Sequence, residues 1–495
     1  MRSDVVVGLD IGTTSTVAVV MRPGGEVLAS ASRPARLFSP QPGFAEADPA
    51  EWWDNACATL REAIGASGVT PAGVCATGML PALVLLDEAG RPLRRSLQQN
   101  DARCVRELEE ISAEIDEAAF LAATGQGVTQ QLVAPKLRWI ARHEPDIFAR
   151  AKHVLGSYDY INARLTGRLT VERNWALEAG FVSLATHALD WKLTALSGLP
   201  ASAFPSLVSA HERIGAVSAE AAAATGLPVG AAVFGGAADH IASALAAGLT
   251  DAGDVLLKFG GAGDVIAISE HAEPDRRLFL DYHLVPGLYA PNGCMAASGS
   301  LLHWLAALVG GGLSLGELDA EAATVPPGAE GVRILPYFLG EKTPIHDALA
   351  RGTITGLSLS HRRGHIWRAA LEAVACGFRH HLDVLADQGR PARRLYASDG
   401  GSRSDIWMRI VADVCGQPVS TLADAYGSSV GAAWVAAVGL GLAQWGDVAK
   451  ARRLGRTFAP TPGAVSPYAD YRALYETLRP FFYRAALAAH QGLQP

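Results

Sequence analysis

Two polar stretches of the chain carry carboxylates beside glycines, a combination that suits the handling of phosphate groups. The first is the loop 10–15 (Asp-Ile-Gly-Thr-Thr-Ser), which lies between two apolar runs within residues 5–20. Asp10 ends a predicted strand, where its carboxylate could hold a hydrated Mg²⁺. Gly12 permits a sharp turn whose backbone N–H groups could bind phosphate oxygens, and hydroxyls are added by Thr13, Thr14 and Ser15. A plain β-hairpin with a Gly/Thr turn is the alternative, because so short a motif is not specific.

The second carboxylate is Asp239, which follows the turn Gly235-Gly236 and heads an Ala-rich stretch that ends at Gly248. This pattern predicts a helix, with Asp239 either as its N-cap or as a general base at the helix start. The two interpretations are compatible, because a capping carboxylate can also face a substrate.

Further glycine turns occur in the second half of the chain. Residues 254–269 repeat the order of apolar run, glycine turn and apolar run, with Gly260 and Gly261 in the turn. This turn, Gly260 to Asp264, has no hydroxyl side chain, so we expect only its backbone N–H groups to reach phosphate. Another Gly pair, Gly400-Gly401, lies between a predicted strand and a helix that starts at Asp405. Such a pair lets a nucleotide approach the backbone closely.

Two strand–glycine loop–strand units, one in each half, predict two domains of like fold that face each other across a nucleotide. This layout resembles the actin/hexokinase/Hsp70 superfamily, in which both domains offer such a loop to ATP. The polar turn 248–253 is the predicted boundary, giving domains 1–248 and 249–495. The elements that must position the loops include a helix capped by Asp48 with Pro49 at its first position, a long helix over 365–385, and a helix of small residues from Gly427.

Composition limits the class of protein. A chain of 495 residues with a net charge of −7 and no Lys/Arg block predicts two large domains and argues against a nucleic-acid partner. The six cysteines have no CxxC spacing, which predicts a reducing compartment and no zinc site. We find no signal peptide pattern, and the longest apolar run, 430–443, is too short and glycine-rich for a membrane span. We therefore expect a cytoplasmic protein.

The whole chain also resembles the FGGY family of carbohydrate kinases. Residues 136–140 (Lys-Leu-Arg-Trp-Ile) approximate the family's first signature, although the residues before them depart from it. The second signature is matched closely by 352–357 (Gly-Thr-Ile-Thr-Gly-Leu), a gap of seven residues, and 365–372 (His-Ile-Trp-Arg-Ala-Ala-Leu-Glu). The loop 340–344 (Gly-Glu-Lys-Thr-Pro) also resembles the family's pattern.

This resemblance implies two actin-like, ribonuclease-H-like α/β domains that flank a central ATP and sugar cleft. It implies ATP and Mg²⁺ as cofactors, with Asp10, Thr13 and Thr14 at the metal and phosphates. It also implies that Asp239 is the catalytic base and that the adenosine loop is at Gly400-Gly401, with Ser404 or Asp405 as the polar residue nearby. A homodimer is a further implication of the resemblance.

The substrate is harder to derive. After the strand that ends at Gly78, glycerol kinases of the family carry an Arg–Glu pair and xylulokinases carry Met–His, whereas this chain has Met79 and Leu80. Xylulokinases also carry Asp–Asn at the base, where this chain has Asp239 and His240. The chain is thus xylulokinase-like without one expected polar contact, which His240 could replace if it does not simply pack in the first helical turn.

A second candidate for sugar contacts is the polar stretch 98–103, in which Asp101 either binds a sugar hydroxyl or pairs with Arg103. The predicted reaction is transfer of the γ-phosphate of MgATP to a hydroxyl of a small ketose, most simply a ketopentose such as xylulose. Ribulose, a tetrulose, a polyol or a sugar acid remain alternative acceptors. A sugar sensor without catalysis and an actin- or Hsp70-like ATPase with a protein ligand are further alternatives.

Overall fold

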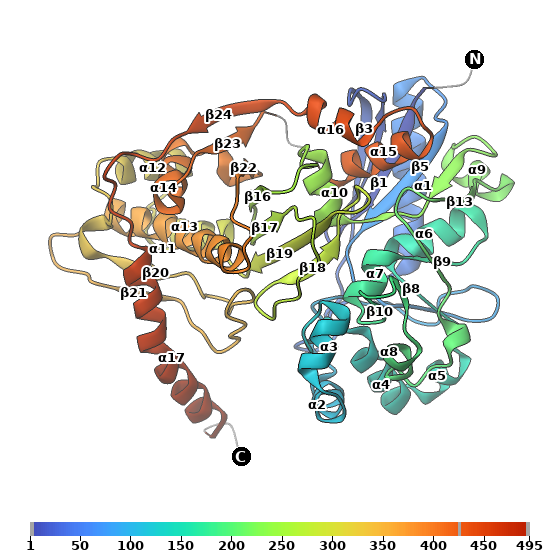
Figure 1. The fold of residues 1–495 in the computed structure, drawn as a ribbon, viewed down its shortest axis with the longest axis horizontal. Helices are drawn as coiled ribbons and strands as arrows, with labels where there is room; N and C mark the ends of the chain where they lie inside the picture. Colours follow the sequence, from blue (N-terminus) through green and yellow to red (C-terminus); the bar gives the residue numbers. More distant parts are fainter. Residues whose placement is uncertain (1–3, 424–426, 492–495) are drawn as a thin grey trace. The chain divides into compact units, whose positions relative to one another are not determined.

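The computed structural model describes residues 4–423 and 427–491, and these form two compact units (Figure 1). Unit 1 contains Met1–Thr250, Glu270–Ala290 and Tyr426–Arg452. Unit 2 contains Asp251–Ser269, Pro291–Ala425 and Arg453–Pro495. Each unit therefore collects segments that are far apart in the sequence, and each is built on one mixed β-sheet with helices packed against it.

The sheet of unit 1 has the strand order β13-β14-β5-β1-β2-β3, with β15 also paired to β5. The pairs β1–β2, β2–β3 and β13–β14 are antiparallel, whereas β1–β5, β5–β14 and β5–β15 are parallel. The strands are β1 (Val6–Ile11), β2 (Ser15–Met21), β3 (Val27–Pro34), β5 (Gly73–Gly78), β13 (Arg213–Ala216), β14 (Ala232–Phe234) and β15 (Ala237–Ala238).

The second seven-stranded sheet has the order β18-β19-β17-β16-β22-β23-β24, and its last six strands repeat this pattern. The pairs β16–β17, β17–β19 and β23–β24 are antiparallel, whereas β16–β22 and β22–β23 are parallel. The strands are β16 (Asp254–Phe259), β17 (Gly263–Ala267), β19 (Tyr289–Met295), β22 (Arg394–Ser398), β23 (Val419–Leu422) and β24 (Leu454–Phe458). Because the same topology occurs twice, the prediction of two like-folded α/β halves is confirmed.

Helices and short strand pairs complete the two units. The helices of unit 1 are α1 (Pro49–Ser67), α2 (Val105–Glu114), α3 (Glu117–Thr124), α4 (Val133–His143), α5 (Pro145–Arg150), α6 (Ser157–Thr166), α7 (Arg173–Glu178), α8 (Trp191–Ala195), α9 (Ala219–Thr225), α10 (Asp239–Ala246), α15 (Ser428–Gly439) and α16 (Trp445–Ala451), with the 3₁₀ turn η1 (Ala201–Ala203). Those of unit 2 are α11 (Gly299–Val309), α12 (Leu315–Ala323), α13 (Arg363–Asp387), α14 (Asp405–Cys415) and α17 (Tyr468–Gln491), with η2 (Ala329–Gly331) and η3 (Gly400–Arg403).

The remaining strands are short. They are β4 (Glu46–Ala47), β6 (Val84–Leu86), β7 (Ser96–Leu97), β8 (His153–Leu155), β9 (Thr170–Glu172), β10 (Val182–Ser183), β11 (Ala188–Leu189), β12 (Ser206–Val208), β18 (Phe279–Tyr282), β20 (Arg333–Leu335) and β21 (Thr353–Thr355). Among the residues that the structure describes, no helix combines the length and the apolar character that a membrane span needs.

Local sequence signals explain where the helices begin. The side chain of Asp48 accepts a hydrogen bond from the N–H of Ala50 (2.9 Å), and Pro49 is the first residue of α1. Trp52 and Trp53 of this helix are buried, so their spacing indicates core packing as expected. The long helix predicted over 365–385 is α13, which begins two residues earlier and ends two residues later.

The helix of small residues, α15, lies against β1 and α10 within unit 1 (Figure 1). The contact is so close that a Cβ atom added to Gly8 in β1 would lie 1.8 Å from the carbonyl oxygen of Ser429. A Cβ added to Gly431 would lie 1.9 Å from the carbonyl oxygen of Ala242 in α10. Glycine is therefore required at both positions, and α15 fixes the strand that leads to Asp10.

We expect Gly8→Ala to destabilise the protein by about 1–3 kcal/mol or more, because the colliding atom is backbone and cannot move like a side-chain end. Urea denaturation followed by circular dichroism measures this loss. Gly446→Ala is the matched control, since its added methyl group meets no atom within 4 Å. If Gly8→Ala unfolded at the same urea concentration as the control, the close packing of α15 on β1 would be refuted.

Candidate active site

The two carboxylates singled out in the sequence lie at the same edge of the unit 1 sheet. In the parallel strands β1, β5 and β15, Asp10 is in register with Thr77, and Thr77 is in register with Ala237. The Thr77 hydroxyl donates to the Ala237 carbonyl oxygen (2.7 Å), which joins β5 to β15. Asp239 directly follows β15. Because β5 lies between β1 and β15, the strands that lead to Asp10 and Asp239 are two strand spacings apart, or roughly 10 Å.

The first loop is the tight turn of a β1–β2 hairpin. The N–H of Gly12 donates to the carbonyl oxygen of Ser15 (3.0 Å), so this N–H closes the turn rather than pointing outward as expected from the sequence. Thr13 and Thr14, at the tip of the turn, are exposed. The hydroxyl of Thr13 also lies 3.7 Å from the sulfur of Met79. The loop thus offers two hydroxyls and touches the residue that follows β5.

Asp239 is the first residue of α10, and the N-cap position belongs to Ala238. The simple capping interpretation of Asp239 is therefore wrong. Its Oδ1 instead accepts the N–H of His240 (2.6 Å), and a negative charge in the first turn of a helix is favourable. The side chain of Asp239 is 37% exposed, so a substrate hydroxyl can reach the carboxylate.

His240 does not present a free nitrogen to a sugar, because both ring nitrogens face carboxylates. Nε2 lies 3.0 Å from Oδ2 of Asp281, and Nδ1 lies 3.3 Å from Oδ1 of Asp239. A third carboxyl, Glu178, lies 3.8 Å from Nε2. Burial alone lowers the pKa of His240, but the hydrogen bonds to Asp239 and Asp281 and the nearby Glu178 raise it well above its usual range. Burial, with the charge of Asp281, likewise raises the pKa of Glu178 well above its ordinary value.

Sequence reasoning missed both Glu178 and Asp281. Glu178 ends α7, and Asp281 lies in β18, 41 residues beyond His240. One signal was present: each is a single acid within an otherwise apolar segment, and such an acid is buried only with a partner.

The residues expected to contact the sugar have different environments. Met79 and Leu80 follow β5 and are both buried, at 2% and 5% exposure. Asp101 is fully buried and pairs with Arg103, and its Oδ2 also accepts the N–H of Ala45 (2.7 Å). The ion-pair alternative for Asp101 is therefore what the structure shows.

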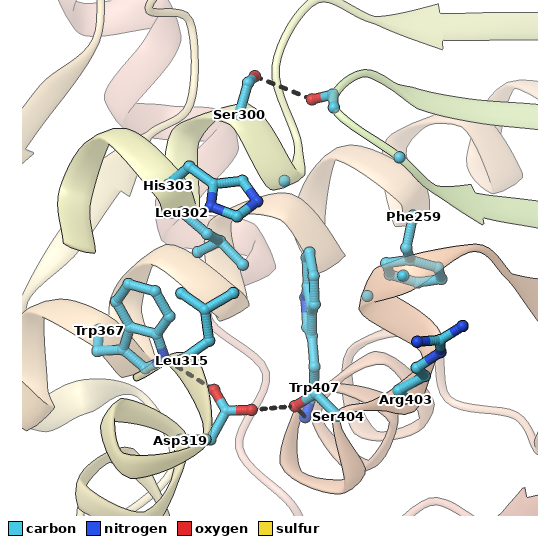
Figure 2. A pocket seen from close by; sticks show the side chains of 16 residues that line it. Phe259, Ser300, Leu302, His303, Leu315, Asp319, Trp367, Arg403, Ser404 and Trp407 are labelled. Atoms are coloured by element: carbon cyan, nitrogen blue, oxygen red, sulfur yellow. Dashed lines mark hydrogen bonds between the residues drawn. The ribbon is translucent and has the colours of Figure 1, made fainter. Parts of the chain in front are cut away.

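A cavity of about 780 Å³ in unit 2 brings together the glycine turns of the second half (Figure 2). Its walls include Gly260, Gly261, Gly400, Gly401 and Ser404. This volume is in the usual range for sites that hold a drug-sized or nucleotide-sized ligand. Its larger side chains are mostly apolar or aromatic: Phe259, Leu302, Leu315, Trp367 and Trp407. Flat apolar walls with few polar groups suit a planar base.

Asp319 is the polar centre of one wall of this cavity, and sequence reasoning missed it. Its two carboxylate oxygens accept from the indole N–H of Trp367 (2.8 Å) and from the hydroxyl of Ser404 (2.6 Å), as Figure 2 shows. This network joins α12, α13 and the start of α14. Asp405, by contrast, does not line the cavity; it forms an ion pair with Arg456, and its side chain is half exposed.

The glycine turn between β16 and β17 is tied to the start of α11. The carbonyl oxygen of Gly261 accepts from the N–H of Ser298 (2.8 Å) and from the N–H (3.1 Å) and hydroxyl (2.9 Å) of Ser300 (Figure 2). The turn itself has no hydroxyl, as its sequence indicates, but Ser300 places one beside it. Nothing in the local sequence signals this, because Ser300 is 39 residues further along the chain.

Glu341, in the loop 340–344, is a buried acid whose ionisation should affect stability. Its Oε1 accepts the N–H groups of Ala296 (2.7 Å) and Lys342 (2.9 Å), and burial raises its pKa to about 7. The folded state therefore holds this proton more tightly than the unfolded state, so the free energy of unfolding falls as the pH rises from about 4.5 to about 7.

We expect Glu341→Gln to remove that share of the pH dependence. The free energy of unfolding of the variant, relative to that of the wild-type protein, should rise by on the order of 2 kcal/mol from pH 5 to pH 8, since one pKa unit is worth about 1.4 kcal/mol. Urea denaturation at the two pH values measures it, with the exposed Glu220→Gln as control. A constant difference between variant and wild type across this range would contradict the assignment.

Taken together, these features define the class of protein. Two units repeat one sheet topology, one with a hydroxyl-bearing turn and an accessible carboxylate, the other with a cavity fit for a nucleotide. This is the architecture of the actin/hexokinase-like ATPases.

Comparison with known proteins identifies the family. Residues 5–246 match the model of the N-terminal domain of the FGGY family of carbohydrate kinases, and residues 264–440 match that of its C-terminal domain. The chain is 30% identical to the xylulose kinase of Lactococcus lactis over 98% of both chains. It is 32% identical to the xylulose kinase of Escherichia coli over 83% of this chain and 85% of that one.

A solved structure agrees with these relatives. The crystal structure of xylulose kinase from Rhodospirillum rubrum is 58% identical, covers 97% of this chain and 100% of that chain, and superposes with a TM-score of 0.93. The chain therefore belongs to the FGGY family of carbohydrate kinases, and it is an enzyme that transfers phosphate to a sugar hydroxyl. Membership of this family implies ATP as the phosphoryl donor.

Proposed function

We propose that the protein transfers the γ-phosphate of MgATP to a hydroxyl of xylulose. The observation that carries the choice of sugar is the 58% identity, over nearly the whole chain, to the xylulose kinase of Rhodospirillum rubrum. Met79 supports it from this chain's own residues, because the pair after β5 is not the Arg–Glu of glycerol kinases.

Asp239 is the proposed general base. It would accept the proton of the attacking hydroxyl and orient its oxygen, with Met79 and Leu80 shaping the sugar side of the site. Phosphoryl transfer asks little covalent chemistry of the protein, so the main tasks are to align the hydroxyl with the phosphate and to stabilise the phosphate charge. Asp101 is not included among the sugar contacts, since its oxygens already bind Arg103 and Ala45.

Asp10 is the proposed magnesium ligand. A strand-end carboxylate beside the exposed hydroxyls of Thr13 and Thr14 fits Mg²⁺, which binds proteins through one or two carboxylates and keeps waters and phosphate oxygens as its other ligands. When bound, the ion would neutralise charge on the phosphates. Gly260, Gly261, Gly400, Gly401 and Ser404 would hold the nucleotide in unit 2. The proposed sugar-binding domain is 1–248 and the proposed adenosine-binding domain is 249–495, apart from residues 270–290 and 426–452, which belong to unit 1.

An ADP-release assay over ketopentoses, ketohexoses, tetruloses, polyols and sugar acids, with the product mapped by NMR, tests the proposal. We expect D-xylulose to stimulate ADP release most strongly and to be recovered as a phosphate ester. Stronger stimulation by another sugar would replace xylulose. Turnover that no sugar stimulates would indicate an actin- or Hsp70-like ATPase, and sugar binding without turnover would indicate a sensor.

Size-exclusion chromatography with light scattering tests the homodimer that the family resemblance implies.

A further inference from the structure

The group around His240 contains more acids than phosphoryl transfer needs. Asp239 belongs to α10, Glu178 to α7 and Asp281 to β18, yet all three carboxyls meet at one imidazole. Asp281 is completely buried, and the side chain of His240 is 21% exposed. Burying charges at this density costs free energy unless they are paired, so the arrangement calls for a specific distribution of protons.

The contacts define that distribution. A carboxylate can only accept hydrogen bonds, so a ring with a carboxylate oxygen at each nitrogen satisfies both contacts only when both nitrogens carry protons. Carboxyl oxygens of Glu178 and Asp281 lie within 4.8 Å of each other beside this ring, and two buried like charges so close favour a proton on one of them. The consistent state has an imidazolium at His240, carboxylates at Asp239 and Asp281, and a neutral carboxylic acid at Glu178.

We propose that His240 is a positioning residue, an imidazolium held by Asp281 and Glu178 that fixes the carboxylate of Asp239 in the orientation that accepts the substrate proton. This inference rests on the proposed role of Asp239 as general base. It replaces the expectation that His240 itself contacts the sugar. A base that is already fixed needs no reorganisation when the hydroxyl arrives. A positioning residue increases the rate because it removes this reorganisation from the reaction.

The elements that carry the acids are themselves fixed to each other. The side-chain NH₂ group of Asn174, in α7, donates to the carbonyl oxygen of Tyr282 (2.9 Å). The side-chain oxygen of Asn174 accepts a hydrogen bond from the backbone N–H of Tyr282 (2.8 Å). Asn174 thereby joins α7 to β18 as a neighbouring strand would, one residue from Asp281. A path of hydrogen bonds and covalent neighbours thus connects α7 to the base. It runs through Asn174, Tyr282, Asp281, His240 and Asp239.

The surrounding charges are few. Beyond the cluster, Glu172 has an electrostatic interaction with Asp281, and Lys136 of α4 has one with Glu178. The other elements that pack on α10, which are α15, β5 and β15, carry no charged side chain. The protonation of His240 is therefore governed by Asp239, Asp281 and Glu178.

A divalent cation is the competing occupant of this cluster. Glu178, His240 and Asp281 offer ligand atoms that all lie within 4.8 Å of one another. The ion network is favoured because Nδ1 faces Asp239 at the same time, and a protonated ring satisfies that contact.

The charge of His240 can be measured without reference to activity, by ¹⁵N NMR of the full-length protein with labelled histidine. The signals are assigned with His240→Asn. We expect both ring nitrogens of His240 to remain protonated at and well above pH 6.5, the ordinary pKa of an imidazole. In Asp281→Asn, the ring should lose its proton at a lower pH than in the wild-type protein, because one carboxylate partner has gone. A neutral ring in the wild-type protein at pH 6.5, or signals that shift stoichiometrically with Zn²⁺, would overturn the proposal.

Kinetics supplies the second measurement. His240→Phe, which keeps a ring but removes both N–H donors, should lower kcat by about 10–100-fold, the range expected when a reacting group is displaced, and leave the KM for ATP within about twofold. Glu178→Gln should lower kcat less than His240→Phe does, because an amide N–H can replace the donor of a neutral acid, whereas an ionised Glu178 would make this change as costly. His187→Asn is the matched control: this ring hydrogen-bonds to Tyr282 of β18 (3.0 Å) but does not touch the cluster.

The failures are distinguishable. If Asp239 is not the base, Asp239→Asn keeps its turnover whatever the NMR result. If Asp239→Asn loses turnover but His240→Phe leaves kcat unchanged, the base assignment stands and the positioning role is overturned. If the imidazolium network is absent, the NMR result fails whatever the reaction proves to be. If Asp281→Asn does not fold, the ring signals of the wild-type protein and the kcat of His240→Phe still test the proton distribution and the rate effect.

Discussion

Asp239→Asn is expected to lower kcat by about 10²–10⁴-fold, the usual contribution of a general base, while ATP still binds with nearly wild-type affinity. The amide keeps the shape of the side chain and can still accept the N–H of His240, so α10 should begin as it does in the wild-type protein. What it loses is the ability to take a proton from the sugar hydroxyl. The measurement is ADP release under saturating substrates, with ATP binding followed by calorimetry.

The control for this variant is Asp146→Asn, which also removes an acid from the first turn of a helix but lies exposed in α5. It should keep full activity. Asp239→Asn that retained more than about a tenth of wild-type turnover would contradict the general-base role. If ATP binding failed as well, the result would instead indicate a disturbed site.

Much of the fold follows from short-range signals in the sequence. The β-branched runs around Gly12 and around Gly260–Gly261 predict strands because such runs fit a buried sheet, and both hairpins are present. The cap at Asp48 and the stripe of α13 mark helices through local hydrogen bonding and periodicity. The repeat of one sheet topology in both units could be inferred because each half places a glycine turn after its first strand.

The distribution of segments between the units could not be inferred from local signals. Residues 270–290 and 426–452 belong to unit 1 although they lie in the second half of the sequence. One consequence is that β18 brings Asp281 to His240, and another is that α15 packs on β1. Both contacts depend on side chains and backbones that meet only after the chain returns.

The candidate site shows the same limit. Asp10, Asp239 and the glycine pairs could be found because their motifs are contiguous and have a direct chemical meaning. Asp319, Ser300, Glu178 and Asp281 could not be found that way, since each acts through a partner at least 39 residues distant or on another element. The comparison with the xylulokinase pattern left His240 either as a replacement sugar contact or as a packed residue, whereas its partners in space engage both ring nitrogens.

Gly401→Ala is expected to weaken ATP binding at least about 10-fold with little change in the KM for the sugar. A Cβ atom at this position would lie 2.4 Å from the ring of Trp407 and 2.7 Å from the Cβ of Phe259. Trp407 cannot move away freely, because it is 2% exposed and its indole N–H donates to the carbonyl oxygen of Leu371 (3.2 Å). The overpacking should cost about 1–3 kcal/mol and displace walls of the cavity.

Gly400→Ala is the matched comparison, because its added methyl group meets no protein atom within 4 Å although Gly400 lines the same cavity. We expect its unfolding to match the wild-type protein, so that any effect on ATP binding comes from contact with the nucleotide itself. Calorimetric titration of each variant with ATP, beside a urea denaturation curve, separates the two effects. Wild-type ATP affinity in Gly401→Ala would mean that the nucleotide binds elsewhere, since a base held against Trp407 and Phe259 must respond when both are displaced.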